Sequence, residues 1–158
     1  FVSSSFSKSF SLYGERVGAL SIVTTSKDEA TRVLSQVKRV IRTNYSNPPT
    51  HGGTVVASVL TSPELRAMWE QELGEMRDRI KSMRNALVDK LAAKGVKIDF
   101  SFVKAQRGMF SYSGLTSAQV DRLRNEHGIY AVSTGRICVA ALNTHNIDAV
   151  VNAIADVL

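Results

Sequence analysis

The pattern that most constrains the fold is a long helical repeat in the middle of the chain. It begins at Ser62-Pro63-Glu64, where proline suits the first helical position, and no other proline occurs before Gly95 ends it. Gly74 inside the repeat costs roughly 1 kcal/mol relative to alanine, and it predicts a bend or close packing. Apolar residues recur every three or four positions: Leu65, Trp69, Leu73, Met76, Ile80, Met83, Leu87 and Leu91. The repeat therefore predicts one helix over residues 63–93 with a single stripe facing a core.

Shorter elements are predicted on both sides of this helix. Residues 1–5 and 17–24 are β-favouring runs that we expect to form strands of a covered sheet. Ser26 and Glu29 form a capping box that starts a helix, and the prolines and turn residues of 44–53 end it before a short apolar helix. Beyond the long helix we expect strands at 98–103, 108–113, 129–132 and 136–140, and helices at 117–127 and 146–158.

This order of elements predicts an α/β or α+β chain in two parts. Residues 63–158 would form the long helix and a small domain, whereas residues 1–62 have the character of the last strands and helices of a larger sheet. We therefore place the domain boundary at residues 62 and 63.

Composition indicates an ordinary globular chain without a membrane span. Of its 158 residues, 44% are hydrophobic and 22% charged, and no apolar run approaches the roughly 20 residues of a membrane helix. A signal peptide is not expected, and the single cysteine, Cys138, excludes an internal disulfide. Cys138 fits a reducing compartment, or it packs as a small apolar residue. The prediction is a cytoplasmic protein with no membrane partner.

The positive charge of the chain is concentrated near its beginning. The net charge is +6, and the first third holds the excess of lysine and arginine, including Lys8, Arg16 and Arg42. No basic stripe interleaved with aromatic residues accompanies these cations, so we predict a pocket for small anions and no nucleic-acid partner.

Other polar residues point to structural roles. His51, His127 and His145 have no metal-ligand spacing with one another or with Cys138, so no metal site is expected. Glu15 could serve as a general base, but a structural ion pair is the preferred interpretation. The pair Gly52-Gly53 is too short for a phosphate-binding glycine loop.

The opening segment of the chain has the composition of a binding site. Serines surround a single lysine, Lys8, and Arg16 follows eight residues later. A lysine can form a Schiff base with an aldehyde, and hydroxyl groups with an arginine can hold a phosphate. A serine-rich surface turn with a solvated lysine is the alternative that the segment alone leaves open.

Several motifs in a fixed order decide between these interpretations. S-S-F-S-K-S-F-S-L-Y-G-E-R-V-G at the start is followed by N-Y-S-N-P-P at 44–49, G-M-F-S at 108–111 and G-R-I-C-V at 135–139. Together they resemble the class I pyridoxal-phosphate-dependent aminotransferases, in the subgroup of aspartate and aromatic amino acid aminotransferases. The resemblance implies an α/β fold covering only the carboxyl-terminal part of such an enzyme: the end of the large domain, the long interdomain helix and the small domain.

The resemblance assigns the first motif to pyridoxal 5'-phosphate. Lys8 matches the lysine that forms an imine with the cofactor and then acts as the base at the substrate Cα. Ser5, Ser7 and Arg16 match residues that hold the cofactor phosphate, and Tyr13 matches a lining position.

The later motifs match substrate-binding positions. Arg136 matches the arginine for the substrate α-carboxylate, and Arg42 the arginine that reaches into a neighbouring subunit and pairs with a dicarboxylate side chain. A homodimer is thereby implied. Ser46 and Asn47 match the border between subunits, and Phe110 matches the substrate side of the pocket. Without the family, Arg136 would be a surface residue, Arg42 would complement a helix dipole, and the other three would be structural.

The implied reaction is transfer of an amino group between an aromatic or dicarboxylic amino acid and a 2-oxo acid, with 2-oxoglutarate as the expected acceptor. Phe6, Ser11, Gly14 and the run at 136–143 look closer to the aromatic subgroup than to enzymes restricted to aspartate. The family's groups for the pyridine ring precede the lysine and have no match here. We therefore expect this segment alone to be inactive, and a non-catalytic fragment is the alternative.

Overall fold

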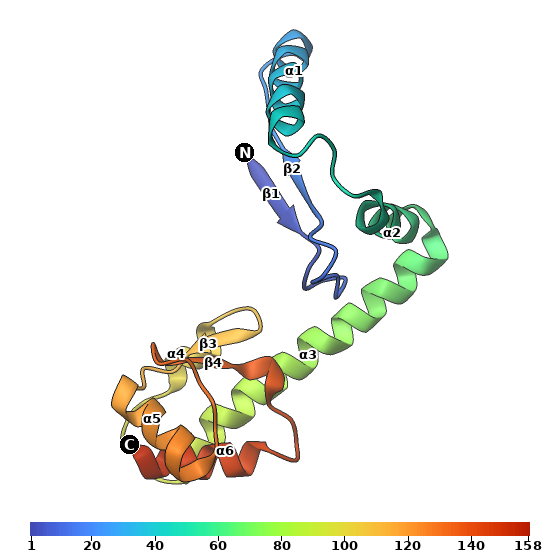
Figure 1. The fold of residues 1–158 in the computed structure, drawn as a ribbon. Helices are drawn as coiled ribbons and strands as arrows, with labels where there is room; N and C mark the ends of the chain where they lie inside the picture. The colour runs from blue at the N-terminus through green and yellow to red at the C-terminus, as the bar shows by residue number, and fades with distance from the viewer. The chain divides into compact units, whose positions relative to one another are not determined.

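The computed structural model describes all 158 residues and divides them into two compact units. These are Phe1–Leu73 and Gly74–Leu158. Helix α3 (Pro63–Ala93) runs without interruption through Gly74 and belongs to both units (Figure 1). The units therefore separate inside the long helix and not at its first residue, and the assignment of 1–62 and 63–158 to domains of a longer enzyme stays a prediction.

The first unit contains a two-stranded hairpin. Strand β1 (Val2–Ser5) pairs antiparallel with β2 (Gly18–Ser21), with Val2 opposite Ser21 and Ser5 opposite Gly18. Gly18 allows close pairing, because a Cβ there would lie 2.7 Å from the Ser4 carbonyl oxygen. The expectation of a covered sheet is wrong for this chain, since every residue of both strands is exposed. The strands pair with each other and leave both faces of the hairpin open.

Two helices complete the first unit, α1 (Lys27–Asn44) and α2 (Thr50–Thr61). The predicted start of α1 is confirmed, because the Ser26 hydroxyl accepts a hydrogen bond from the Glu29 amide at 3.2 Å. The carboxylate of Glu29 does not return to Ser26; it accepts from the amide and hydroxyl of Thr25, at 2.7 and 2.6 Å. These hydrogen bonds lower the pKa of Glu29. No residue of α1 is buried.

The second unit has a continuous core built on the end of α3. Around it lie α4 (Ser101–Ala105), β3 (Phe110–Tyr112), α5 (Ser117–His127), β4 (Arg136–Cys138), the 3-10 turn η1 (Val139–Ala141) and α6 (Ile147–Val157). β3 and β4 form an antiparallel pair with Tyr112 opposite Arg136. The most deeply buried side chains are Leu87, Leu91, Val103, Leu123, Val139, Val151 and Ile154. The prediction of α5 is confirmed, with a capping box at Thr116 and left-handed Gly128 at its end.

Two predicted strands of this unit are wrong. Residues 98–103 do not form a strand: the Asp99 carboxylate accepts hydrogen bonds from the amide and hydroxyl of Ser101, each at 2.8 Å, and α4 begins there. Residues 129–132 form no strand either, although Ile129 and Ala131 pack against the core. Here the chain turns back, because the amides of Val132 and Gly135 donate to the carbonyls of Arg136 and Val132.

The apolar stripe of α3 is buried over only part of its length. Met83, Leu87 and Leu91 belong to the core of the second unit, whereas Leu65 and Met76 are 43% and 48% exposed. The sequence prediction of a continuous core stripe is therefore correct only for the carboxyl-terminal half of the helix, where the elements after it fold back. None of the helices has the length and apolar character needed to cross a membrane.

Shortening a side chain on the buried half of α3 tests this division. We expect Leu91→Ala to lower the free energy of unfolding by about 2–5 kcal/mol, because it leaves a cavity in a packed core. Leu65→Ala, on the exposed half of the same helix, is the matched control and should change it by about 0.5 kcal/mol or less. Urea unfolding followed by circular dichroism measures both, and equal losses would contradict the division.

Candidate functional site

The segment around Lys8 forms the loop that joins β1 to β2. The Phe6 amide donates to the Val17 carbonyl at 3.2 Å, which closes the base of the loop just beyond the paired strands. Inside it, Phe10 and Ser11 donate to the carbonyls of Phe6 and Lys8, also at 3.2 Å, and make a compact turn. Lys8 is exposed on this turn. The hairpin thus presents the lysine on a short loop with both ends fixed.

An aromatic contact that the sequence did not predict anchors the turn. The indole Nε1 of Trp69 donates to the Ser9 carbonyl at 2.7 Å, and the indole stacks on the Phe10 ring at 4.6 Å between centroids. Phe6 meets Phe10 edge-on at 5.5 Å. Trp69 was predicted to belong to a core stripe, but it serves here as a support for the lysine turn. The sequence did not predict this role because Trp69 lies 60 residues from Ser9 along the chain.

Four of the five predicted cofactor residues lie in this loop, and the fifth, Ser5, ends β1 directly before it. Lys8 Nζ lies 4.7 Å from the centroid of the Tyr13 ring, a cation–π contact, and the Ser7 amide donates to the Ser5 hydroxyl at 3.3 Å. Ser7 is buried. Arg16 takes a positive φ of 53° and donates from Nη1 to the Tyr13 carbonyl at 3.0 Å. Lys8 and Arg16 both contact Tyr13, and Ser5 and Ser7 contact each other, so this part of the hairpin carries an ammonium, a guanidinium and two hydroxyls.

Glu15, the only carboxylate of the loop, pairs with a residue outside the loop. Glu15 Oε2 lies 2.9 Å from His51 Nδ1 at the start of α2, so the expected structural partner of Glu15 exists and is His51. Gly52 permits this approach, because a Cβ there would lie 2.9 Å from Glu15 Cβ and 3.2 Å from Val17 Cβ. Within this unit neither Lys8 nor Arg16 forms an ion pair. A donor set without its own acid suits an anion such as a phosphate monoester.

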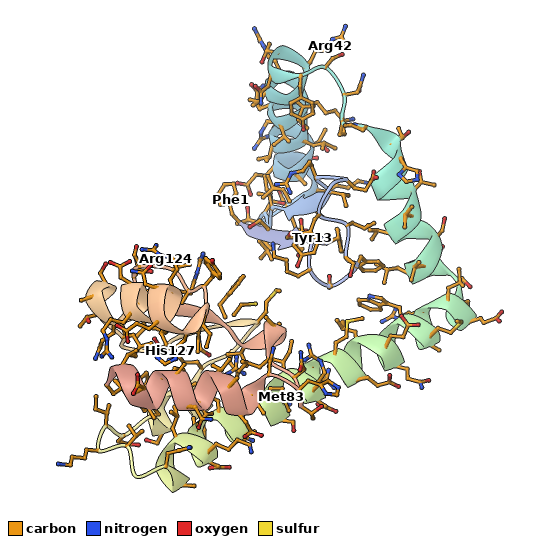
Figure 2. All side chains as sticks on the ribbon, turned by 60° about the horizontal axis from the view of Figure 1, so that its bottom comes forward. Phe1, Tyr13, Arg42, Met83, Arg124 and His127 are labelled. Carbon is orange, nitrogen blue, oxygen red and sulfur yellow. The ribbon has the colours of Figure 1, made fainter.

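Arg42, Ser46 and Asn47 form a separate group at the end of α1. Arg42 lies in the last turn and donates from Nη1 to the Ser46 hydroxyl, and Ser46 has a positive φ of 72°. The Asn47 amide donates to the Tyr45 carbonyl at 2.9 Å. In Figure 2, Arg42 and Tyr13 of the lysine loop are well separated. Within this unit, therefore, Arg42 does not join the Lys8 group.

The remaining predicted residues, Arg136 and Phe110, meet in the second unit. The guanidinium carbon of Arg136 lies 4.9 Å from the centroid of the Phe110 ring, and both residues are exposed. Gly135 precedes the arginine at φ 84°, where a Cβ would lie 2.7 Å from the Leu115 carbonyl oxygen. The amide and hydroxyl of buried Ser113 both donate to the Gly135 carbonyl, at 2.9 and 2.7 Å. The hairpin thus holds Arg136 at a fixed position on its surface.

Arg79 is a further residue that sequence analysis did not single out. It donates from Nη1 to the Leu142 carbonyl at 2.7 Å and from Nη2 to the Ala140 carbonyl at 2.8 Å. One guanidinium thereby ties α3 to the segment that follows β4.

One group of possible metal ligands lies between α5 and α6. One ligand atom each of Glu126, His127 and Asp156 lies within 4.8 Å of the others, a grouping that sequence spacing did not predict. His127 and Arg124 project from α5 in Figure 2. Arg122 donates to both Glu126 oxygens and lies 3.6 Å from Asp156. The hydrogen bond between Arg122 and Glu126 raises the pKa of Arg122 and lowers the pKa of Glu126. The group is explained as an ion-pair network.

Comparison with known proteins identifies the class to which this fold and loop belong. The profile of aminotransferase class I and II matches residues 1–154, and the chain belongs to this family. The predicted resemblance is confirmed, and so is the fold class.

Two of the relatives carry different substrate names. The chain is 77% identical over 158 residues to an aspartate aminotransferase of Pseudomonas aeruginosa, covering all of this chain and 40% of that protein. It is 52% identical over 157 residues to an aromatic-amino-acid aminotransferase of Escherichia coli, covering 99% of the chain and 40% of the relative. The chain thus spans about two fifths of the length of both.

A solved structure supports the same relationship. An aromatic-amino-acid aminotransferase from Burkholderia pseudomallei, covalently bound to pyridoxal phosphate, matches with a TM-score of 0.96 and 82% identity. The match covers 99% of this chain and 39% of that one. Relatives named for aspartate and for aromatic substrates therefore both align over nearly the whole chain.

The single tryptophan gives a direct test of the aromatic support. Removing the stacked ring by Phe10→Ala exposes the Trp69 indole to water, so we expect its fluorescence maximum to move to longer wavelength. Tyr45→Ala, which removes an exposed aromatic ring of the same unit, should leave the spectrum unchanged. An unchanged spectrum for Phe10→Ala would show that the stacking does not exist in solution.

Proposed function

We propose that this chain is the carboxyl-terminal part of a pyridoxal-phosphate-dependent aminotransferase. The complete protein transfers an amino group between an aromatic or dicarboxylic amino acid and a 2-oxo acid, with 2-oxoglutarate as acceptor. The observation that carries the proposal is the loop in which Lys8, Arg16 and the two serines lie together without an acid partner, in a chain of this family. An enzyme restricted to aspartate is the alternative substrate range, supported by the relative of that name in Pseudomonas aeruginosa.

The donor set of the loop fits the proposed cofactor. Arg16 supplies a planar guanidinium and Ser5 and Ser7 supply hydroxyls, which suit the oxygens of a phosphate dianion. The ammonium of Lys8 lies on the same turn, and the Tyr13 ring beneath it limits where the lysine can point. Bound pyridoxal phosphate would supply an aldehyde carbon and an electron-withdrawing ring.

Lys8 is the residue to which we assign proton transfer. A primary amine on a flexible stem can take a proton from the substrate Cα and return it to a neighbouring atom. The Trp69 and Phe10 contacts fix the turn, so that only the side chain of Lys8 needs to move. A fixed backbone with a mobile amine suits a base that must serve two positions.

Arginines are assigned to the carboxylates of the substrate. We assign Arg136 to the α-carboxylate, because a guanidinium accepts a carboxylate through two parallel hydrogen bonds, and Phe110 covers one face of that guanidinium. Arg42, with Ser46 and Asn47 beside it, is assigned to the side-chain carboxylate of a substrate bound in a second subunit. Its position away from the lysine loop of its own unit supports a role in a partner copy. The complete protein would then be a homodimer, and we propose a cytoplasmic location for it.

A non-catalytic fragment is the second candidate, and it is supported by the share of its relatives that the chain covers. It predicts that the 158 residues by themselves bind no cofactor productively. Intact mass of the protein in its source separates the two candidates.

Covalent labelling tests the role of Lys8. In a complete protein, pyridoxal phosphate followed by borohydride should label Lys8, and Lys8→Ala should abolish the label and slow transamination by about 10²–10⁴-fold or more. Lys27→Ala, at the exposed start of α1, is the control and should keep both label and rate. A complete protein that incorporates no label at Lys8 would overturn the proposed function.

Substrate preference tests the role of Arg42. Arg42→Leu should lower kcat/KM for aspartate by about 10–100-fold, since a charge-assisted hydrogen bond contributes about 1.5–3 kcal/mol, and should affect phenylalanine much less. Arg39→Leu on the same helix is the matched control. If Arg42 serves the neighbouring subunit, mixing Arg42→Leu with Lys8→Ala subunits should give aspartate activity above that of either variant alone. Equal losses for aspartate and phenylalanine would contradict the assignment.

A further inference from the structure

The second unit contains one buried arginine, Arg84 on α3. Only 4% of this residue is exposed, and within this unit its guanidinium is paired with no carboxylate. Burial, together with the positive charge of Arg107, lowers the pKa of Arg84. A buried cation without an acid is costly unless its N–H groups are used, so its hydrogen-bond partners indicate its purpose.

The two partners of Arg84 flank Phe110: Gly108 lies in the turn before β3, and Ser111 lies in β3 itself. Its Nη2 donates to the Gly108 carbonyl at 2.5 Å, and its Nε donates to the hydroxyl of Ser111, which is itself buried, at 3.3 Å. Gly108 has a positive φ of 84°, so the chain turns sharply at this carbonyl. The guanidinium therefore fixes the backbone before Phe110 and the side chain after it.

The contacts of Arg84 with Gly108 and Ser111 determine where the Phe110 ring lies against Arg136. Ser111 faces Ile137 in the β3–β4 ladder. Phe110, the residue before Ser111, contacts Arg136, the residue before Ile137, diagonally across the two strands, with 4.9 Å between the guanidinium carbon and the ring centroid. Because side chains alternate along a strand, holding Ser111 inward holds Phe110 outward. Arg84 is thus connected to Arg136 through two residues of one strand.

We propose that Arg84 is a positioning residue for the substrate carboxylate: by binding Gly108 and Ser111 it holds the Phe110 ring against Arg136 and so orients the Arg136 guanidinium. This inference rests on the proposed function for its substrate, but the contact between Phe110 and Arg136 does not depend on that function. A guanidinium of fixed orientation binds a carboxylate with less loss of rotamer freedom than a mobile one.

A purely structural role for Arg84 would also be lost on substitution, so the test needs a signal from Arg136 itself. In the 158-residue chain, the Phe110 ring current should shift the side-chain NMR signals of Arg136, and Phe110→Leu measures how far they move when the ring is gone. We expect Arg84→Met to move them most of the way to that position, and Arg84→Lys to recover only part of the shift, because an ammonium lacks the planar fork. Arg107→Met, which removes a nearby exposed arginine bound to the Ala105 and Gln106 carbonyls, should leave them unchanged.

Kinetics of the complete protein provide the second measurement. We expect Arg84→Met to raise KM for aspartate and phenylalanine alike by roughly 10- to 100-fold, with kcat changed much less, because a misplaced binding group weakens binding of every substrate. Arg136→Lys is measured beside it. If Arg136→Lys leaves KM unchanged, the assigned role of Arg136 fails, whereas the NMR signals still decide the role of Arg84.

Two outcomes would overturn the proposal. A folded Arg84→Met chain whose Arg136 signals match those of the wild type shows that Arg84 does not position the pair. The second outcome is that Arg84→Met moves the Arg136 signals but leaves KM unchanged, while Arg136→Lys raises KM. This would show that the orientation set by Arg84 does not affect substrate binding. If Arg84→Met does not fold, Ser111→Ala removes one acceptor and should move the Arg136 signals in the same direction by less.

Discussion

The burial of the carboxyl-terminal half of α3 is the constraint on which the second unit depends. Leu87 and Leu91 are almost inaccessible, and the helices and strands that follow α3 bury their apolar faces against the same core. Polar groups of this half of the helix then reach outward to the loops, with Arg79 on the segment after β4 and Arg84 on the turn before β3. One helix thus supplies both the core and the hydrogen bonds that shape the hairpin carrying Arg136.

The first unit depends on a different kind of support. It has almost no buried apolar residues, and its loop is shaped by a few specific contacts: the Trp69 indole on one side, and the close approach of Gly52 on the other. Each contact brings in a residue far along the chain, so the conformation around Lys8 is not a property of the serine-rich segment alone. The hairpin fixes both ends of the loop, and α2 and α3 supply the residues that contact it.

Sequence reasoning succeeded where a local physical signal was strong. α3 and α5 were predicted almost to the residue, because proline, glycine and capping residues mark their ends and the apolar period fills their length. It failed at 98–103 and 129–132, where short apolar runs fit a strand as well as a buried turn, and tertiary contacts decided the outcome. The residues of the candidate site were predicted from motifs, whereas Trp69, Gly52, Arg79 and Arg84 act only through contacts between segments that are distant in sequence.

The anchoring of the lysine turn also sets an order for events during synthesis. The Trp69 indole that holds the Ser9 carbonyl lies 60 residues further along the chain. At about 5–20 residues per second, the ribosome makes those residues in roughly 3–12 s, far longer than a hairpin needs to form. The β1–β2 hairpin can therefore close early, but its loop stays unsupported until α3 has emerged, so Lys8 is placed last among the parts of its own unit.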